Sequence, residues 1–335
     1  LTKKSFSYAT DAFKSTWISS TGKYILEVEE KLQELLNAKH VITCNTGSSA
    51  CHIMSRAMKE FYPSKTKIKA PNNVYVAAVN GFLTDRHHTL LNQDCSLDTW
   101  NIDESTLSNE DEIVLIVHNI GNIINVPKLK RLYPNTIFLE DNCEGFLGQY
   151  ENKMSGTAAL CSAISFFGNK NITCGEGGAF ITDNDDIYEY SKLMRGQGQS
   201  STRFVHNELG YNYRLTNVQA AILKSQLELL PEILERKTEI FEKYRLELGQ
   251  LEHVNLQKIE ENTKHSNWMF GFRLDREKSK GYGHLETFFK ERNIEVRPMF
   301  YPMSRHKYLK EEKLMNFGIE DNAKLVNETS VILPS

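Results

Sequence analysis

Lys170 stands just after an apolar run, in the stretch SAISFFGNKNITCGEGGAFIT that spans residues 162–182. The apolar run stops at Gly168, and a polar, glycine-rich turn follows the lysine. Inside a pocket at a strand end, desolvation favours the neutral amine, which can attack an aldehyde. The pattern therefore predicts that Lys170 forms a covalent imine with a phosphate-bearing cofactor. A surface lysine in a loop is the plain alternative.

A carboxylate in the segment IFLEDNCEG, residues 137–145, suits the same chemistry. Asp141 follows an apolar run and is expected where a buried strand ends. Pyridoxal phosphate accepts electrons only when its ring nitrogen stays protonated, and a nearby carboxylate holds that proton in place. Asp141 could supply this carboxylate, or it could simply cap a turn.

The segment CNTGSSA, residues 44–50, is a candidate phosphate site. A strand is expected to end at its first residue and a helix to begin near Ser48. Helix amino termini present unpaired N–H groups and partial positive charge, which suit a phosphate. Gly47 allows close approach of the backbone, and Ser48 and Ser49 add hydroxyl donors. A simple helix cap by Ser48 is the alternative.

An aromatic side chain lies between these segments in the sequence. Tyr75, in PNNVYVAAVNG, could lay its ring against a flat cofactor, or it could be an ordinary core or surface tyrosine. Each signal is modest alone. Their order along the chain is phosphate turn, aromatic residue, strand-end aspartate, and lysine before a glycine turn, and this order favours a pyridoxal phosphate site.

Alternating strands and helices must position these residues. Continuous apolar runs are typical of strands covered on both faces, and helical patterns lie between them, so we predict a mainly parallel α/β sheet. The predicted strands cover residues 41–44, 68–70, 89–91, 113–117, 136–140, 163–167 and 179–182. The predicted helices cover residues 24–37, 48–61, 184–195 and 217–248, the last one broken or kinked by Pro231.

The pattern changes after Leu251. A strand at 268–274, a helix at 284–293 and a strand at 294–299 ending near Pro298 predict a smaller α+β unit. We therefore expect a large domain over residues 1–245 and a small domain over residues 246–335.

Composition excludes several other classes of function. The chain has 335 residues and a net charge of −3, so it carries no overall field for nucleic acid. Its apolar stretches are shorter than the roughly 20 residues of a membrane span. Six cysteines show neither Cys-x-x-Cys pairs nor zinc spacing, so we expect no metal and free thiols in the cytoplasm. A doubly wound dehydrogenase is not supported, because the Gly-x-Gly-x-x-Gly motif of dinucleotide-binding proteins does not follow the first strand.

Over nearly its whole length, from STWISSTGKYILEVEEKL to VILPS, the sequence resembles the DegT/DnrJ/EryC1/StrS family of sugar aminotransferases. The most specific blocks are EDNCEGFLGQY, SFFGNKNITCGEGGAFIT and RGQGQSSTRFVHNELGYNYRLTNVQAAI; the last resembles perosamine and viosamine synthases. The resemblance implies the fold type I of aspartate aminotransferase, with a seven-stranded sheet and a small domain. Because relatives continue past Ser335 into another helix, it also implies a small domain truncated at its end.

The resemblance assigns a role to each matching position. Lys170 would form the internal aldimine and shuttle the proton, and Asp141 would hold the ring nitrogen. The other implied cofactor contacts are Tyr75 and Cys143 on the two ring faces, Glu144 near the phenolic oxygen, Gly47, Ser48, Ser49 and Ser165 at the phosphate, and Asn212 from the neighbouring subunit of a homodimer. The implied substrate contacts are Trp17, Arg214 and Arg297.

The resemblance implies that glutamate donates an amino group to C4 of a nucleotide-linked 4-keto-6-deoxyhexose. The product would be a 4-amino-4,6-dideoxyhexose of the viosamine or perosamine type. Amination at C3, and a regulator that binds the cofactor without turnover, remain open. A dehydratase branch lacks the lysine and is disfavoured by Lys170. The sequence departs from the family pattern at four positions. Cys143 stands where alanine is more usual, and Glu144 stands where glutamine or histidine is more usual. Gln197 and Ser304 both stand where histidine is more usual.

Overall fold

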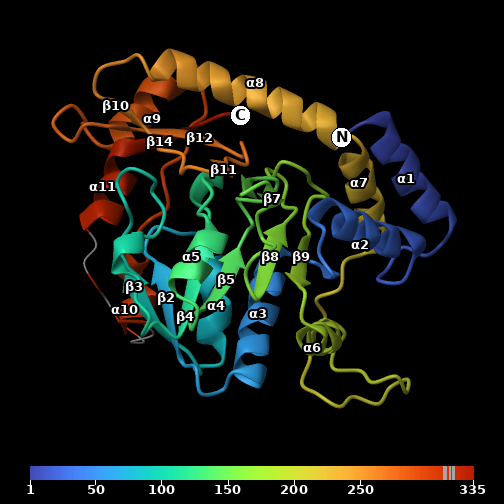
Figure 1. Cartoon of the computed structure of the whole chain (residues 1–335). Coiled ribbons are helices and arrows are strands. Elements are labelled where there is room, and N and C mark those ends of the chain that lie inside the picture. The colour runs from blue at the N-terminus through green and yellow to red at the C-terminus, as the bar shows by residue number, and fades with distance from the viewer. Residues whose placement is uncertain (312–314, 317, 319–320) are drawn as a thin grey trace.

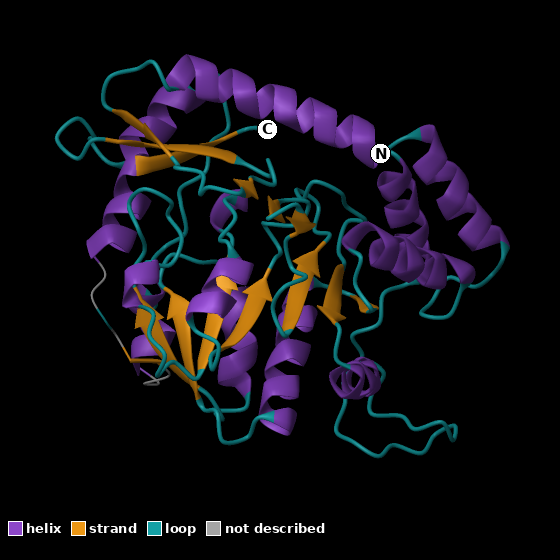
Figure 2. Cartoon of the chain, in the orientation of Figure 1, coloured by secondary structure: helices purple, strands orange, loops and turns teal. Residues whose placement is uncertain are grey.

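An eight-stranded sheet forms the centre of the computed structural model, which describes residues 1–311, 315–316, 318 and 321–335. Its spatial order is β1-β9-β8-β5-β4-β2-β3-β13, and β9 runs opposite to the other seven strands (Figure 2). The strands are β1 (His40–Cys44), β2 (Lys67–Pro71), β3 (Thr89–Gln93), β4 (Ile113–Val117), β5 (Ile137–Asp141), β8 (Cys161–Ser165), β9 (Gly178–Thr182) and β13 (Met315–Asn316).

Helices cover both faces of this sheet, which explains the continuous apolar runs. Successive residues of β4 belong to different cores, because side chains of a strand alternate between faces. Ile113, Leu115 and Val117 share one core with α3, α4 and α6, whereas Val114 and Ile116 pack with α5. Further along the sheet, α2 and α7 pack against β8 and β9. The helices are α2 (Lys23–Leu36), α3 (Gly47–Phe61), α4 (Ala77–Thr84), α5 (Val126–Leu132), α6 (Asp185–Arg195) and α7 (Asn217–Glu228).

The long helical pattern that begins at residue 217 breaks at Leu229, and Pro231 lies in the first turn of the next helix, α8 (Leu230–Leu248). Proline is tolerated there because the first N–H groups of a helix have no partner within it. α8 crosses the molecule and leads to a second sheet, β10-β12-β14 (Figure 1). The other α-helices and strands are α1 (Lys3–Lys14), α9 (Tyr282–Lys290), α10 (Lys307–Glu311), α11 (Asp321–Thr329), β6 (Gln149–Tyr150), β7 (Lys153–Met154), β10 (Val254–Leu256), β11 (Thr263–Lys264), β12 (Phe270–Leu274) and β14 (Ser330–Leu333).

All seven predicted sheet strands are present, and the sheet gains an eighth, two-residue strand, β13, at its edge. The predicted strand over 294–299 is wrong. That segment pairs only through the bridge between Arg297 and Ile332, and Pro298 has no N–H to extend the ladder. The domain division at residue 245 falls in the last turn of α8 and stays a prediction.

Within the described residues, no helix has both the length and the apolar character that crossing a membrane requires.

Candidate active site

A cavity of about 490 Å³ collects most of the predicted site residues. This volume lies within the range of small-molecule sites, roughly 300–1,000 Å³. Residues from the ends of β5 and β8 and from the start of α3 meet there with residues from the carboxyl-terminal part of the chain. The predicted residues that line the cavity are Gly47, Ser48, Tyr75, Asp141, Cys143, Glu144, Ser165, Lys170 and Arg297.

The amino terminus of α3 lines the cavity and is its candidate anion-binding part. Thr46 is the N-cap, and its hydroxyl oxygen accepts a hydrogen bond from the Ser49 backbone N–H at 3.0 Å. A Cβ on Gly47 would lie 2.8 Å from the Ser165 Cβ and 3.0 Å from the Cys143 Sγ, so only glycine fits this close approach. With the partial positive charge of a 15-residue helix and the adjacent hydroxyls of Ser48 and Ser165, the donor set fits a phosphate.

Asp141 is the last residue of β5 and is only 7% exposed. One of its oxygens accepts a hydrogen bond from the Cys143 backbone N–H at 3.0 Å, which orients the carboxylate at the strand end. Its position in the cavity fits the protonated ring nitrogen of pyridoxal phosphate, which needs a carboxylate partner.

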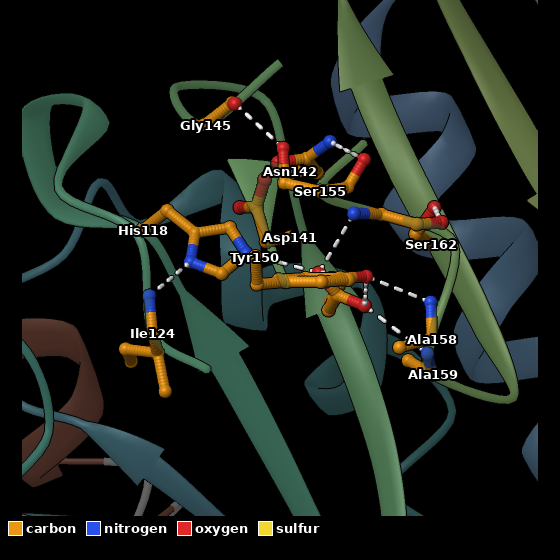
Figure 3. Close-up of polar contacts among 12 residues, drawn as sticks. His118, Ile124, Asp141, Asn142, Gly145, Tyr150, Ser155, Ala158, Ala159 and Ser162 are labelled. Carbon is orange, nitrogen blue, oxygen red and sulfur yellow. Dashed lines mark hydrogen bonds and ion pairs between the residues drawn. The ribbon is translucent and has the colours of Figure 1, made fainter. Parts of the chain in front are cut away.

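A buried polar network fixes the strand end that carries Asp141 (Figure 3). The neighbouring Glu140 is fully buried and accepts hydrogen bonds from His118 Nε2 at 2.9 Å, the Gly156 N–H at 2.8 Å and the Tyr150 hydroxyl at 3.1 Å. His118 Nδ1 accepts from a backbone N–H, so its Nε2 carries the proton that reaches Glu140. These donors satisfy the buried carboxylate and hold the β5 end in place.

Lys170 enters the cavity from the turn after β8, and its neighbour there is an aromatic ring. The Lys170 Nζ lies 3.7 Å from the ring centroid of Trp268, which is only 5% exposed. In the same turn, Gly175 has a φ of +90°, a backbone conformation that favours glycine. The backbone conformation of this turn therefore explains the glycine at position 175. The turn leads the chain into β9.

Glu144 is a buried carboxyl group at the cavity wall, 6% exposed. Burial raises its pKa to about 7, although the Lys170 charge and a 2.7 Å hydrogen bond from the Ile120 backbone N–H act in the opposite direction. The buried carboxyl group is therefore stabilised both by this donor and by protonation near neutral pH. A protonated Glu144 can donate a hydrogen bond into the cavity, as a glutamine would.

The apoprotein of Glu144→Gln is expected to gain stability relative to wild type as pH rises. A raised carboxyl pKa means that wild type loses stability between the ordinary value of 4.5 and about 7. The difference in unfolding free energy should grow by about 3 kcal/mol over this range. Denaturant unfolding of both apoproteins at about pH 5 and about pH 8 measures it. An equal difference at both pH values would refute the buried carboxyl assignment.

Two thiols lie beside Asp141 at the cavity wall. One donor atom each from Cys51, Asp141 and Cys143 lies within 4.8 Å of the others. A hydrogen bond with Cys51, together with burial, raises the pKa of the Cys143 thiol well above its ordinary value, so the thiol stays protonated. Cys143 therefore presents a neutral, polarisable sulfur at the cavity wall, and its contact with a cofactor ring stays a prediction.

Four predicted residues do not line this cavity. Ser49 donates its hydroxyl to Asn45 within the turn, and Arg214 donates its Nε to Ser20. Trp17 is 60% exposed, and Asn212 is exposed as well. Their roles stay predictions.

The structure adds cavity residues that the sequence reasoning missed. These are Thr46, Cys51, Ala77, Phe167, Asn169, Glu176, Trp268, Met269, Pro298, Phe300 and Ile332. Ser304, where histidine is usual, is buried against Asn72 and does not line the cavity.

Comparison with known proteins identifies the family of the chain. The model of the DegT/DnrJ/EryC1/StrS aminotransferase family matches residues 1–335. The chain is 32% identical over 312 residues to a GDP-perosamine synthase of Escherichia coli O157:H7, covering 90% of this chain and 83% of that protein. It is 32% identical over 306 residues to a GDP-perosamine synthase of Caulobacter vibrioides, covering 88% and 81%.

Solved structures share the fold. Helicobacter pylori PseC, an aminotransferase of pseudoaminic acid biosynthesis, superposes with a TM-score of 0.89 at 24% identity, covering 100% of this chain and 91% of PseC. An E. coli GDP-4-keto-6-deoxy-D-mannose-3-dehydratase with bound hydrated PLP gives 0.90 at 20% identity, covering 99% and 92%. The fold is therefore type I, as expected. The chain belongs to the DegT/DnrJ/EryC1/StrS aminotransferase family, a family of pyridoxal-phosphate-dependent sugar aminotransferases.

Proposed function

We propose that the protein transfers an amino group from glutamate to C4 of a nucleotide-linked 4-keto-6-deoxyhexose, giving a 4-amino-4,6-dideoxyhexose of the perosamine or viosamine type. The observation that carries this proposal is that Lys170, Asp141 and the start of α3 line one cavity. The identity to GDP-perosamine synthases over most of the chain favours amination at C4.

Different residues of the cavity have different roles in holding the cofactor. Bound pyridoxal phosphate supplies an aldehyde that condenses with amines and a ring that takes up electrons. The α3 amino terminus with Ser48 and Ser165 anchors the phosphate, and Asp141 keeps the ring nitrogen protonated. Tyr75 lies beside Phe300, with ring centroids 6.1 Å apart, and would cover one ring face.

Lys170 moves the proton in this account. With the cofactor bound, its Nζ would be the general base and then the general acid that moves a proton at the substrate carbon bearing the amino group. Glutamate and the keto sugar use the same cavity in turn, so ping-pong kinetics are expected. Arg297 lines the cavity and is the candidate contact for an anionic group of either substrate.

The presence of Lys170 argues against a lysine-less 3-dehydratase, although the dehydratase fold is similar. C3 amination is the second candidate within the family. A non-catalytic regulator would hold the cofactor without taking an amino group from glutamate. We place the reaction in the cytoplasm, where the six free thiols would stay reduced.

A panel of GDP-, UDP- and dTDP-linked 4-keto-6-deoxyhexoses with nitrogen-labelled glutamate tests the substrate. We expect label in the sugar product by mass spectrometry and at C4 by NMR. Label at C3 would favour the second candidate. Deoxygenation of the sugar at C3 without label, or no reaction of glutamate, would contradict the proposal.

We also propose a homodimer with shared sites, in which Asn212 of one copy completes the anion site of the other. Asn212 is exposed and does not line the cavity of its own chain. Lys170→Ala and Asn212→Asp should each be nearly inactive alone. After mixing and subunit exchange, activity should return to about a quarter of wild type, because a mixed dimer keeps one intact site. No recovery after confirmed exchange would mean that Asn212 acts within its own chain or not at all.

A further inference from the structure

The segment from Ser266 to Trp268 holds the lysine turn on both sides of Lys170. The indole Nε1 of Trp268 donates to the Asn169 carbonyl at 2.9 Å, and the Asn171 side chain donates to the Ser266 carbonyl at 2.8 Å. These two hydrogen bonds involve the residues immediately before and after the lysine. The segment therefore fixes the position of the Lys170 backbone.

The same segment is tied to the cofactor-facing wall. Ser266 Oγ donates to the Glu144 carbonyl at 2.7 Å and accepts from the Trp268 N–H at 3.3 Å, and the Ser266 N–H donates to the Gly121 carbonyl at 2.9 Å. Trp268 is thus a well-anchored ring, and its indole N–H is already used.

The face of that ring is where the Lys170 amine lies, with its Nζ 3.7 Å from the ring centroid. An ammonium over an indole is attracted by the ring quadrupole, and the attraction grows when water is excluded. The indole face carries no carboxylate that could form an ion pair with the Lys170 ammonium group. Glu144 and Asp141 line the same cavity and could hold the ammonium more tightly through an ion pair.

We propose that Trp268 is a positioning residue that receives the Lys170 amine whenever it is not joined to the cofactor. The inference rests on the proposed function, since each transfer of an amino group must free the lysine and then use it again. Holding the amine on the indole face keeps it near its working position and away from the two carboxyl groups. The weak, non-covalent contact lets the amine return.

Fluorescence of the apoprotein tests the contact without any turnover. Lys170→Met removes the charge but keeps an unbranched side chain, so the emission of Trp268 should shift. The same substitution in a Trp268→Phe background should give no shift, which excludes a contribution from Trp17 and Trp100. An equal shift in both backgrounds would show that the lysine does not lie on Trp268. The absence of a shift in both backgrounds would show the same.

Single-turnover transfer from glutamate to the cofactor-loaded enzyme tests the role. Trp268→Leu removes the ring face, and the rate should fall about tenfold with unchanged half-saturation by glutamate. Trp268→Phe lacks the N–H but keeps a face, so its rate should stay within about threefold of wild type.

Two kinetic results would overturn the role: a Leu variant at the wild-type rate, or a Phe variant as slow as the Leu variant. The second result would mean that only the hydrogen bond to Asn169 matters. If wild type takes no amino group from glutamate, the proposed function fails together with the kinetic role. The apoprotein fluorescence still decides whether Trp268 holds the lysine.

Discussion

Replacement of Lys170 by alanine is expected to abolish turnover while the protein stays folded. The substitution removes the amine that we propose joins the cofactor and moves the proton. General acid–base catalysis alone contributes roughly 10²–10⁴-fold, so the steady-state rate should fall by at least about a hundredfold. The visible absorption band of the lysine-linked cofactor should disappear as well. Steady-state assays and absorption spectra of the loaded proteins measure both effects.

The fold should survive this change because no hydrogen bond or ion pair of the Lys170 Nζ occurs among the described residues, and its contact is with the Trp268 ring. Thermal unfolding of the apoprotein should therefore resemble wild type. Addition of a small primary amine should restore part of the rate, since it can replace the missing base. Full activity without added amine would end the mechanism proposed here.

Replacement of Asp141 by asparagine is expected to leave cofactor binding largely intact and to slow the reaction by roughly a hundredfold or more. Asparagine is close in size, but it cannot hold a proton on the ring nitrogen. The proposed phosphate contacts at α3 and the proposed bond to Lys170 do not depend on this carboxylate. The cofactor content per chain and the rate at saturating substrates check the two halves of this prediction.

A cofactor analogue whose ring nitrogen is replaced by carbon provides the matched control. Wild type loaded with the analogue should be about as slow as Asp141→Asn with the natural cofactor. The rate of Asp141→Asn should fall little further when the variant is loaded with the analogue, because both changes remove the same interaction. A variant at the wild-type rate would count against the role of Asp141.

The buried strands were predictable because their residues are apolar on both faces. Ile113–Val117 was predicted with the observed bounds, and Asp141 was correctly expected at the end of a strand. In a parallel sheet the carboxyl ends of strands lie at one edge, so polar residues at those ends converge. This geometry explains why Asp141 and Lys170, singled out from their sequence context, line one cavity, whereas Ser165 was assigned only through the family resemblance.

The missed residues from the carboxyl-terminal part of the chain reach the site through long-range contacts. Trp268 was assigned only to a strand, and nothing local indicates that its indole packs under Lys170. The partner of Glu144 is the backbone N–H of Ile120, which has a φ of +51° in a short irregular turn. Neither contact follows from periodicity or spacing.

The wrong strand over 294–299 has a related cause. Its alternation of apolar and polar residues resembles a strand, but a strand also needs a partner. The partner is β14, which already pairs with β12 on its other side. Only one bridge forms, because Pro298 ends the ladder.

Reductive trapping of the loaded protein tests the central claim most directly. Borohydride should fix the cofactor to the chain, and trypsin should then fail to cut after the modified lysine. We predict that mass spectrometry will find one modified peptide spanning residues 154–192, with the added mass on Lys170. A cofactor fixed to another lysine, or a loaded protein in which no lysine is modified, would contradict this account.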